Sequence, residues 1–192
     1  MKTLNYLLLL ICIFCSVNAY ANSEKNAVYD TMKAYANLTA CNHSFERSNS
    51  GVETTLKDVF LVNQEIHTDD TPKQTTYYVF WHGDIGCQGS NHSAQYFITT
   101  VFKRYTDHFL VLDDHFAFGD EGELISYSHI DSIKQLSHDQ FVITAWEYTD
   151  IDGYDYAYDQ YLYTLKKQYS EHGLWTGWYL TSKKWLARKD NI

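Results

Sequence analysis

The first periodic segment of the chain predicts a single helix. Four apolar residues repeat at i, i+4, i+7 and i+8: Val28, Met32, Tyr35 and Ala36. This spacing places their side chains on one face of a helix. Ser23 stands at the start of the run, where a hydroxyl side chain caps the first turn. We therefore expect an amphipathic helix over residues 22–40 whose apolar face packs on the rest of the fold.

After Gly51 the pattern changes to short runs rich in β-branched and aromatic residues, which predict strands. The predicted strands cover residues 56–67, 75–82, 94–104, 109–118, 130–136, 141–148, 160–167 and 174–185. They come in neighbouring pairs joined by short polar turns, such as Ser137–Gln140 and Ser170–Gly173. Because a parallel crossover needs a longer connection, we expect each pair to be antiparallel.

Together these elements predict an α+β fold, with an N-terminal helix packed on a curved antiparallel β-meander of about eight strands. A partial barrel is the preferred form, and a two-sheet sandwich is the alternative. The aromatic content of 17% fits this class, because aromatic side chains suit the half-buried surfaces of strands. The single proline, Pro72, and the lack of a low-complexity linker indicate one domain over residues 22–192.

The beginning of the chain, MKTLNYLLLLICIFCSVNAYA, predicts a secretory signal peptide. Lys2 supplies the positive start, a short apolar core follows, and Ala19-Tyr20-Ala21 fits the small residues that precede a cleavage site. The apolar core is too short to span a bilayer. We therefore expect a signal peptide over residues 1–21, cleavage after Ala21, and a periplasmic or secreted location.

Export determines how the cysteines are interpreted. Cys12 and Cys15 would leave with the signal peptide, so the mature chain would keep only Cys41 and Cys87. Two cysteines in an oxidising compartment are expected to pair. The two cysteines are 46 positions apart. A disulfide that closes a loop of this length stabilises a fold by about 4 kcal/mol in the chain-entropy model.

The charge balance limits the class of partner. The chain has a net charge of −9, which becomes −10 when Lys2 leaves with the signal peptide. An acidic surface repels nucleic acid and anionic membranes and favours a cationic protein partner, such as a protein of the cell envelope. No further apolar segment reaches the length of a membrane span. No motif in the chain indicates a cofactor.

One stretch, FWHGDIGCQGSNHS at Phe80–Ser93, contains the residue types of an active site. His82, Asp84 and His92 are residues that zinc accepts as ligands. Asp84 could instead orient His82 as the general base of a hydrolase, with Cys87 or Ser90 as the nucleophile.

Each of these chemical interpretations has a weakness. The His82-Gly-Asp84 spacing is not diagnostic of a metal site. A disulfide would remove the thiol of Cys87, and Ser90 lacks the Gly-x-Ser-x-Gly nucleophile turn.

A structural role explains the same stretch better. Glycines recur every third position, at Gly83, Gly86 and Gly89, where a predicted strand ends. Glycine allows the positive φ that tight turns need. Asp84 can accept hydrogen bonds from backbone amides of such a turn. We therefore predict a turn that Cys87 anchors to the end of the helix.

The residues Trp81–Ser90 resemble the signature W-x-G-D-x-G-C-x-G-G-S-G-T of an uncharacterised group of exported proteobacterial proteins. Further points of similarity are Leu-Thr-x-Cys at Leu38–Cys41, Ala-Phe-Gly at Ala117–Gly119 and a closing Trp-rich hairpin. The chain departs from the signature after Gly89, so His92 does not belong to it. The resemblance implies export and a shared fold, and it implies no activity.

A second candidate site is the acidic, tyrosine-rich stretch DIDGYDYAYD. Its candidate binding residues are Asp150, Asp152, Tyr154, Asp155, Tyr156, Tyr158 and Asp159. Clustered carboxylates are typical of calcium loops, but the spacing differs from that of an EF-hand. The composition predicts a long solvated hairpin loop. The alternating tyrosines favour a recognition surface, because tyrosine offers a large contact area at a low entropic cost.

These observations favour a non-enzymatic binding module of the inhibitor or immunity type, exported from the cytoplasm. Two alternatives stay open: a hydrolase that uses His82 and Asp84, with or without a metal, and an accessory component of an envelope or secretion assembly.

Overall fold

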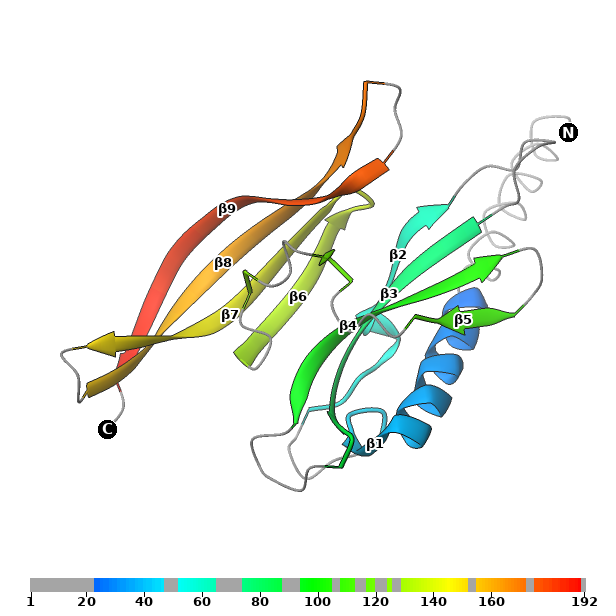
Figure 1. Cartoon of the computed structure of the whole chain (residues 1–192), viewed down its shortest axis with the longest axis horizontal. Coiled ribbons are helices and arrows are strands. Elements are labelled where there is room, and N and C mark those ends of the chain that lie inside the picture. The colour runs from blue at the N-terminus through cyan, green and yellow to red at the C-terminus, as the bar shows by residue number, and fades with distance from the viewer. Residues whose placement is uncertain are drawn as a thin grey trace, which may run out of the picture.

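A computed structural model of the chain describes residues 23–46, 52–64, 74–87, 94–104, 108–112, 117–119, 124–125, 129–151, 155–171 and 175–190. It confirms the predicted α+β class: a helix is followed by antiparallel strands (Figure 1). The described strands form two sheets, one of five strands and one of four. The first sheet is curved and carries the helix on one face, and the second sheet lies on its other side (Figure 1).

The helix covers residues 23–39. Its predicted apolar face is confirmed, because Val28, Met32 and Ala36 are all 0% exposed and pack against the first sheet. The helix ends one residue earlier than expected. The physical reason is that Ala40 already pairs with Ile85 as the first residue of a strand.

The first sheet contains the strands β1 (Ala40–His43), β2 (Val59–Gln64), β3 (Gln74–Ile85), β4 (Gln95–Arg104) and β5 (Phe109–Val111). β3 is the central strand: β1 and β2 pair with different parts of one of its edges, and β4 pairs with the other. A short 3₁₀ helix, Leu56–Asp58, leads into β2 and is capped by Thr55. The strand predicted over residues 109–118 is too long, since β5 ends at Val111.

β3 is buried on both faces, which explains its nearly continuous apolar sequence. Tyr77, Val79 and Trp81 pack with the helix. Tyr78, which points the other way, packs with residues of the second sheet. The helix, the first sheet and the second sheet therefore form three successive layers.

The second sheet is a simple meander of β6 (Ile130–Ser137), β7 (Gln140–Ile151), β8 (Asp155–Tyr169) and β9 (Trp175–Asp190). All four hairpin pairings expected from the sequence are confirmed: β2 with β3, β4 with β5, β6 with β7, and β8 with β9. β6 pairs with β7 only as far as Ala145, so the distal parts of β7, β8 and β9 extend beyond it.

The two sheets share one aromatic core. Tyr78 of the first sheet lies beside Phe118, Phe141 and Trp178, with ring centroids 5.3, 6.1 and 6.1 Å away. Its hydroxyl donates to the carbonyl oxygen of Ala117 at 2.7 Å and accepts from Nε1 of Trp178 at 2.7 Å. The buried hydroxyl is thereby satisfied, which removes the desolvation cost of a polar group in the core.

Candidate functional site

The predicted disulfide between Cys41 and Cys87 is confirmed, with an S–S distance of 2.01 Å and a Cα–Cα distance of 5.1 Å. It joins β1, which follows the helix, to the end of β3. Cys87 is thus bonded to sulfur, and it is not the free thiolate that a cysteine nucleophile must be.

The glycines of the stretch Phe80–Ser93 play two different roles. Gly83 lies inside β3, so the prediction that it turns the chain is wrong. A Cβ atom at this position would lie 2.5 Å from the ring of Trp81, which explains the glycine by close packing. The turn comes later, at Gly86 and Cys87, whose φ angles are 78° and 58°. Gly89 lies outside the described residues.

His82 and Asp84 lie on β3 two residues apart, so their side chains share one face of the strand. The ring of His82 is half-buried beside Tyr96, with centroids 4.8 Å apart. Burial lowers the pKa of His82, so its imidazole is neutral at pH 7. Asp84 is buried, at 8% exposure.

The metal site predicted from these residues cannot be assembled from the described part of the chain. His92 lies outside it, and the described ranges contain no group of three His, Cys, Asp or Glu side chains placed to hold an ion.

The acidic stretch at 150–159 is built differently from the prediction. A long hairpin loop was expected, but β7 and β8 continue through most of it. Asp150 pairs with Tyr156, and Ile151 pairs with Asp155. Asp152 and Tyr154 fall between the strands, outside the described residues. The error has a physical cause: β-pairing with a long partner strand overrides the turn preference of Asp and Gly.

Asp159, expected at a solvated surface, is 4% exposed. Its two carboxylate oxygens accept from the guanidinium of Arg188, each at 2.8 Å, and Oδ1 also accepts from Nε1 of Trp185 at 3.1 Å. In this bidentate pair both oxygens of the carboxylate are bound within the fold. Asp159 therefore does not belong to an acidic recognition surface.

Tyr158 does line an open cleft. The cleft has a volume of about 430 Å³ and lies over the second sheet, lined by His129, Asp131, Trp146, Tyr158 and Lys189. Trp146 follows the buried Ala145 on β7, so it points to the face opposite the core. Tyr158 pairs with Tyr148 on one side and with Lys189 on the other, which places all three on that same face. This cleft on the outer face of the second sheet is called the outer cleft below.

Hydrogen bonds hold the side chains of the outer cleft in place. Oδ2 of Asp131 accepts from Nε1 of Trp146 at 2.8 Å and from Nε2 of Gln160 at 2.5 Å. The rings around Tyr158 are tilted: that of His129 is 5.4 Å away at 48°, and that of Tyr148 is 5.8 Å away at 77°. Tyr148 is 55% exposed. The outer cleft thus combines exposed aromatic surface with an oriented carboxylate.

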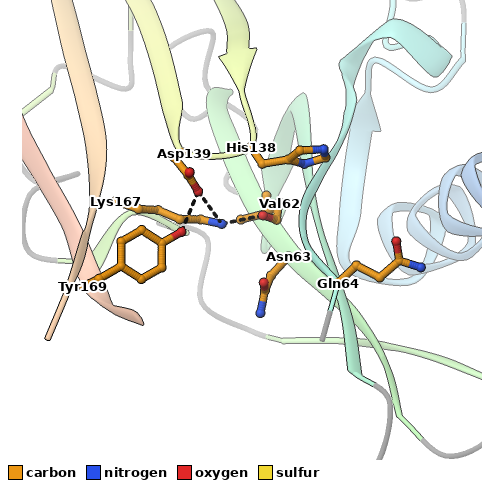
Figure 2. Close-up of a pocket in the computed structure, with 7 residues that line it drawn as sticks. All are labelled: Val62, Asn63, Gln64, His138, Asp139, Lys167 and Tyr169. Atoms are coloured by element: carbon orange, nitrogen blue, oxygen red, sulfur yellow. Dashed lines mark hydrogen bonds and ion pairs between the residues drawn. The ribbon is translucent and has the colours of Figure 1, made fainter. Parts of the chain in front are cut away.

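A second cavity, of about 310 Å³, lies where the two sheets meet. Its lining residues are Val62, Asn63, Gln64, His138, Asp139, Lys167 and Tyr169 (Figure 2). The side chain of Lys167 is only 2% exposed. Its Nζ donates to the carbonyl oxygen of Val62 at 2.5 Å and lies 3.6 Å from Oδ1 of Asp139. Burial lowers the pKa of Lys167, and the charge of Asp139 opposes that shift.

The side chains around this cavity form a junction between the two sheets, because they bind backbone carbonyls along one edge of β2. Gln135 and His138 both contact the carbonyl oxygen of Leu61, at 2.6 and 3.2 Å, and Lys167 binds the next carbonyl. Asp139 also accepts from the hydroxyl of Tyr169 at 2.6 Å. Burial first, and then this contact with Asp139, raise the pKa of Tyr169 to about 12. The polar groups of the junction thus bind one another and the backbone, as expected of a structural contact.

Sequence reasoning did not find either cavity. For the junction, one signal was present: Tyr163, Leu165 and Lys167 alternate on β8, so a charged residue continues an apolar face. For the outer cleft, Tyr158 was identified and its neighbours were not, since they come from other strands and depend on register.

Comparisons with protein-family models, curated proteins and solved structures found no match to this chain. The resemblance to the exported proteobacterial group therefore stays a prediction. Within the described ranges, no helix has the length and apolar character needed to cross a membrane.

Proposed function

We propose that the protein is a non-enzymatic binding module, exported to an oxidising compartment, and that the outer cleft is its recognition site. The observation that carries the proposal is the cleft itself: a cavity of about 430 Å³ lined by aromatic and charged side chains on a sheet face. Ligand sites in proteins are commonly cavities of this size, with aromatic walls and a few positioned polar groups.

The construction of the outer cleft supports binding. Its residues stand on paired strands, and Trp146 is held through Nε1 by Asp131. A recognition surface that is ordered before the ligand arrives loses little conformational entropy on binding. Tyrosine and tryptophan are also the residues that most often dominate binding energy.

Export is supported by the predicted signal peptide at residues 1–21 and by the Cys41–Cys87 disulfide, which is compatible with an oxidising compartment. If the captured material is a protein, the net charge of −10 expected after cleavage predicts that this protein is cationic. Asp159 of the acidic stretch does not contribute to such an attraction, because its carboxylate is bound by Arg188.

The hydrolase alternative has less support. Cys87 is in the disulfide, and the ring of His82 packs against Tyr96. His82 is neutral at pH 7 and would suit a general base, yet it lines neither the outer cleft nor the cavity where the two sheets meet.

Affinity capture from an envelope fraction tests the proposal. The wild-type protein, Tyr158→Ala and Tyr179→Ala are immobilised, and the captured material is analysed for protein by mass spectrometry and for glycan by staining. Tyr179 is a matched control, because it is 41% exposed on the same outer face but far from the outer cleft. It pairs with Lys166, which lies about 26 Å from Tyr158 along β8.

We expect capture by the wild type and by Tyr179→Ala, and loss of capture with Tyr158→Ala. Equal capture by all three proteins would contradict the proposed site. A hydrolytic activity that disappears in His82→Ala would replace the proposed function by the enzyme alternative.

A further inference from the structure

We infer that the outer cleft binds an uncharged oligosaccharide of two or more rings. The inference rests on the proposed function and names the ligand class of the same site. It follows from three properties of the outer cleft: its span, the arrangement of its aromatic rings, and two opposite charges for which the described residues supply no ion-pair partner.

The span of the outer cleft sets the size of the ligand. Its lining residues include one from each strand of the second sheet, from Asp131 on β6 to Lys189 on β9, and His129 directly precedes β6. Four adjacent strands cover three spacings of about 4.8 Å, or about 14 Å in all. One sugar ring is shorter than this distance, and two or three linked rings match it. A protein interface would need a much larger contact area than five side chains provide.

The aromatic rings suit a saturated ring better than a flat one. The ring of Tyr158 is tilted by 48° to that of His129 and by 77° to that of Tyr148. A nucleobase or another flat aromatic ligand is best held between parallel rings, which this arrangement lacks. A pyranose presents C–H groups on its faces, and these contact the electron-rich face of a single aromatic ring. Each tilted ring can therefore face one sugar unit.

The polar groups of the outer cleft complement hydroxyl groups. Oδ2 of Asp131 accepts two hydrogen bonds, from Trp146 and Gln160, which fix the carboxylate in one orientation. Among the described residues, Oδ1 of Asp131 has no donor, and the ammonium of Lys189 has no acceptor or ion-pair partner. A carboxylate oxygen accepts from a hydroxyl group, and an ammonium donates to one, so a sugar can use both.

The charges of the outer cleft favour an uncharged ligand. One carboxylate, on Asp131, and one ammonium, on Lys189, balance each other. These two residues stand on the outermost strands, β6 and β9, which are too far apart for a zwitterion the size of an amino acid to reach both. A polyanion such as nucleic acid is opposed by the net charge of the chain, −9 before any cleavage.

The test is a glycan array that carries uncharged oligomers of glucose, galactose, mannose and N-acetylglucosamine together with charged glycans, followed by calorimetry with the best ligand. We expect binding of an uncharged oligomer, and weaker or no binding of its single-ring unit. Asp131→Asn removes the charge and leaves one acceptor oxygen, which cannot serve both Trp146 and Gln160 on one side and the ligand on the other, so binding is expected to weaken by about tenfold. Tyr148→Ala truncates an exposed side chain, so it leaves the fold intact and is expected to weaken binding by a similar factor.

Tyr179→Ala should bind like the wild type. The inference is overturned if no uncharged glycan on the array binds, or if Tyr148→Ala and Tyr158→Ala both bind as tightly as the wild type. If no glycan binds but envelope capture still depends on Tyr158, the sugar assignment fails and the proposed binding function stands. If both experiments are negative, both fail.

Discussion

Nζ of Lys167 on β8 donates to the carbonyl oxygen of Val62 on β2, across 2.5 Å and between the two sheets. The two residues are 105 positions apart in the chain. Among the described strands β2 pairs with β3 alone, so the carbonyls on its other edge need partners from elsewhere. Lys167 is therefore a buried cation whose main role is to hold the edge of the first sheet to the second (Figure 2).

Lys167→Met should destabilise the protein. Methionine keeps most of the apolar stem but leaves the carbonyl oxygen of Val62 without its donor. An unsatisfied buried acceptor costs about 1–3 kcal/mol. Urea unfolding followed by circular dichroism measures the change in the free energy of unfolding. Lys166→Met is the matched control, because Lys166 is exposed on the opposite face and should change stability by less than about 0.5 kcal/mol. Equal effects of the two substitutions would show that the contact with Val62 is not stabilising.

The pH dependence of stability should also reflect the lowered pKa of Lys167. The pKa of Lys167 is lowered by burial in the folded state, whereas in the unfolded chain it returns to its ordinary value of 10.5. In the window between these two pKa values, the unfolded state holds the extra proton, so the contribution of Lys167 to stability rises with pH. Below the folded-state pKa both states are protonated, and the contribution is constant. The stability difference between the wild type and Lys167→Met is therefore expected to grow as the pH rises through the folded-state pKa towards 10.5, and a constant difference up to pH 10.5 would contradict the lowered pKa.

The sequence predicted the structure well where that structure depends on local residue patterns or on composition. The helix followed from the spacing of Val28, Met32 and Ala36, and the disulfide from there being two cysteines in a chain predicted to be exported. Contacts that depend on strand register were not predictable. Lys167 meets Val62 only because β8 and β2 lie in sheets that pack together.

The contact between Asp159 on β8 and Arg188 on β9 also depends on strand register, and it was not predictable from the sequence. A register shift lies between Gln160 and Tyr161, and the pairing brings Asp159 opposite Arg188. No local pattern in an acidic, tyrosine-rich stretch reveals a bulge on a neighbouring strand. The stretch was therefore interpreted by composition alone, as a solvated loop.

Reduction of the Cys41–Cys87 disulfide should lower stability without a large change in the native fold. The bond spans 46 positions and ties the end of the helix to the end of β3. Constraint of the unfolded chain by a loop of this length is worth about 4 kcal/mol in the chain-entropy model. Thermal unfolding with and without a reducing agent measures the loss. The double variant Cys41→Ala, Cys87→Ala should unfold at the temperature of the reduced wild type and should not respond to reductant. A reductant effect on this variant would point to another cause.

Arg188→Ala should destabilise the distal part of the second sheet. The substitution leaves the buried carboxylate of Asp159 without its bidentate partner. Breaking a buried ion pair by removal of one partner costs several kcal/mol, and the partial exposure of Arg188 reduces this to about 2 kcal/mol. The double variant Asp159→Asn, Arg188→Ala should recover part of the loss, because the uncompensated charge is gone. Lys184→Ala, an exposed neighbour, is the control. Additive single effects in the cycle would show that the two side chains are not coupled.

Gly83→Ala should be more damaging than Gly86→Ala, although only Gly86 has a positive φ. A Cβ atom at Gly83 would lie 2.5 Å from the ring of Trp81. That ring is 1% exposed and its Nε1 donates to Oγ1 of Thr99 at 2.9 Å, so it cannot move aside without loss of a buried hydrogen bond. Overpacking of this kind costs about 1–3 kcal/mol. At Gly86 an added Cβ meets nothing within 4 Å, and the left-handed backbone alone costs about 1 kcal/mol.

Urea unfolding of the two glycine variants measures this difference, and the Trp81→Phe background provides its control. Phenylalanine lacks the outer ring of the indole, so Gly83→Ala should cost less in that background than in the wild type, whereas the cost of Gly86→Ala should not change. An unchanged cost of Gly83→Ala in Trp81→Phe would mean that contact with the indole is not why glycine is required at position 83. Glycine would then be explained by the approach of the carbonyl oxygen of Asn42, which would lie 3.2 Å from the added Cβ.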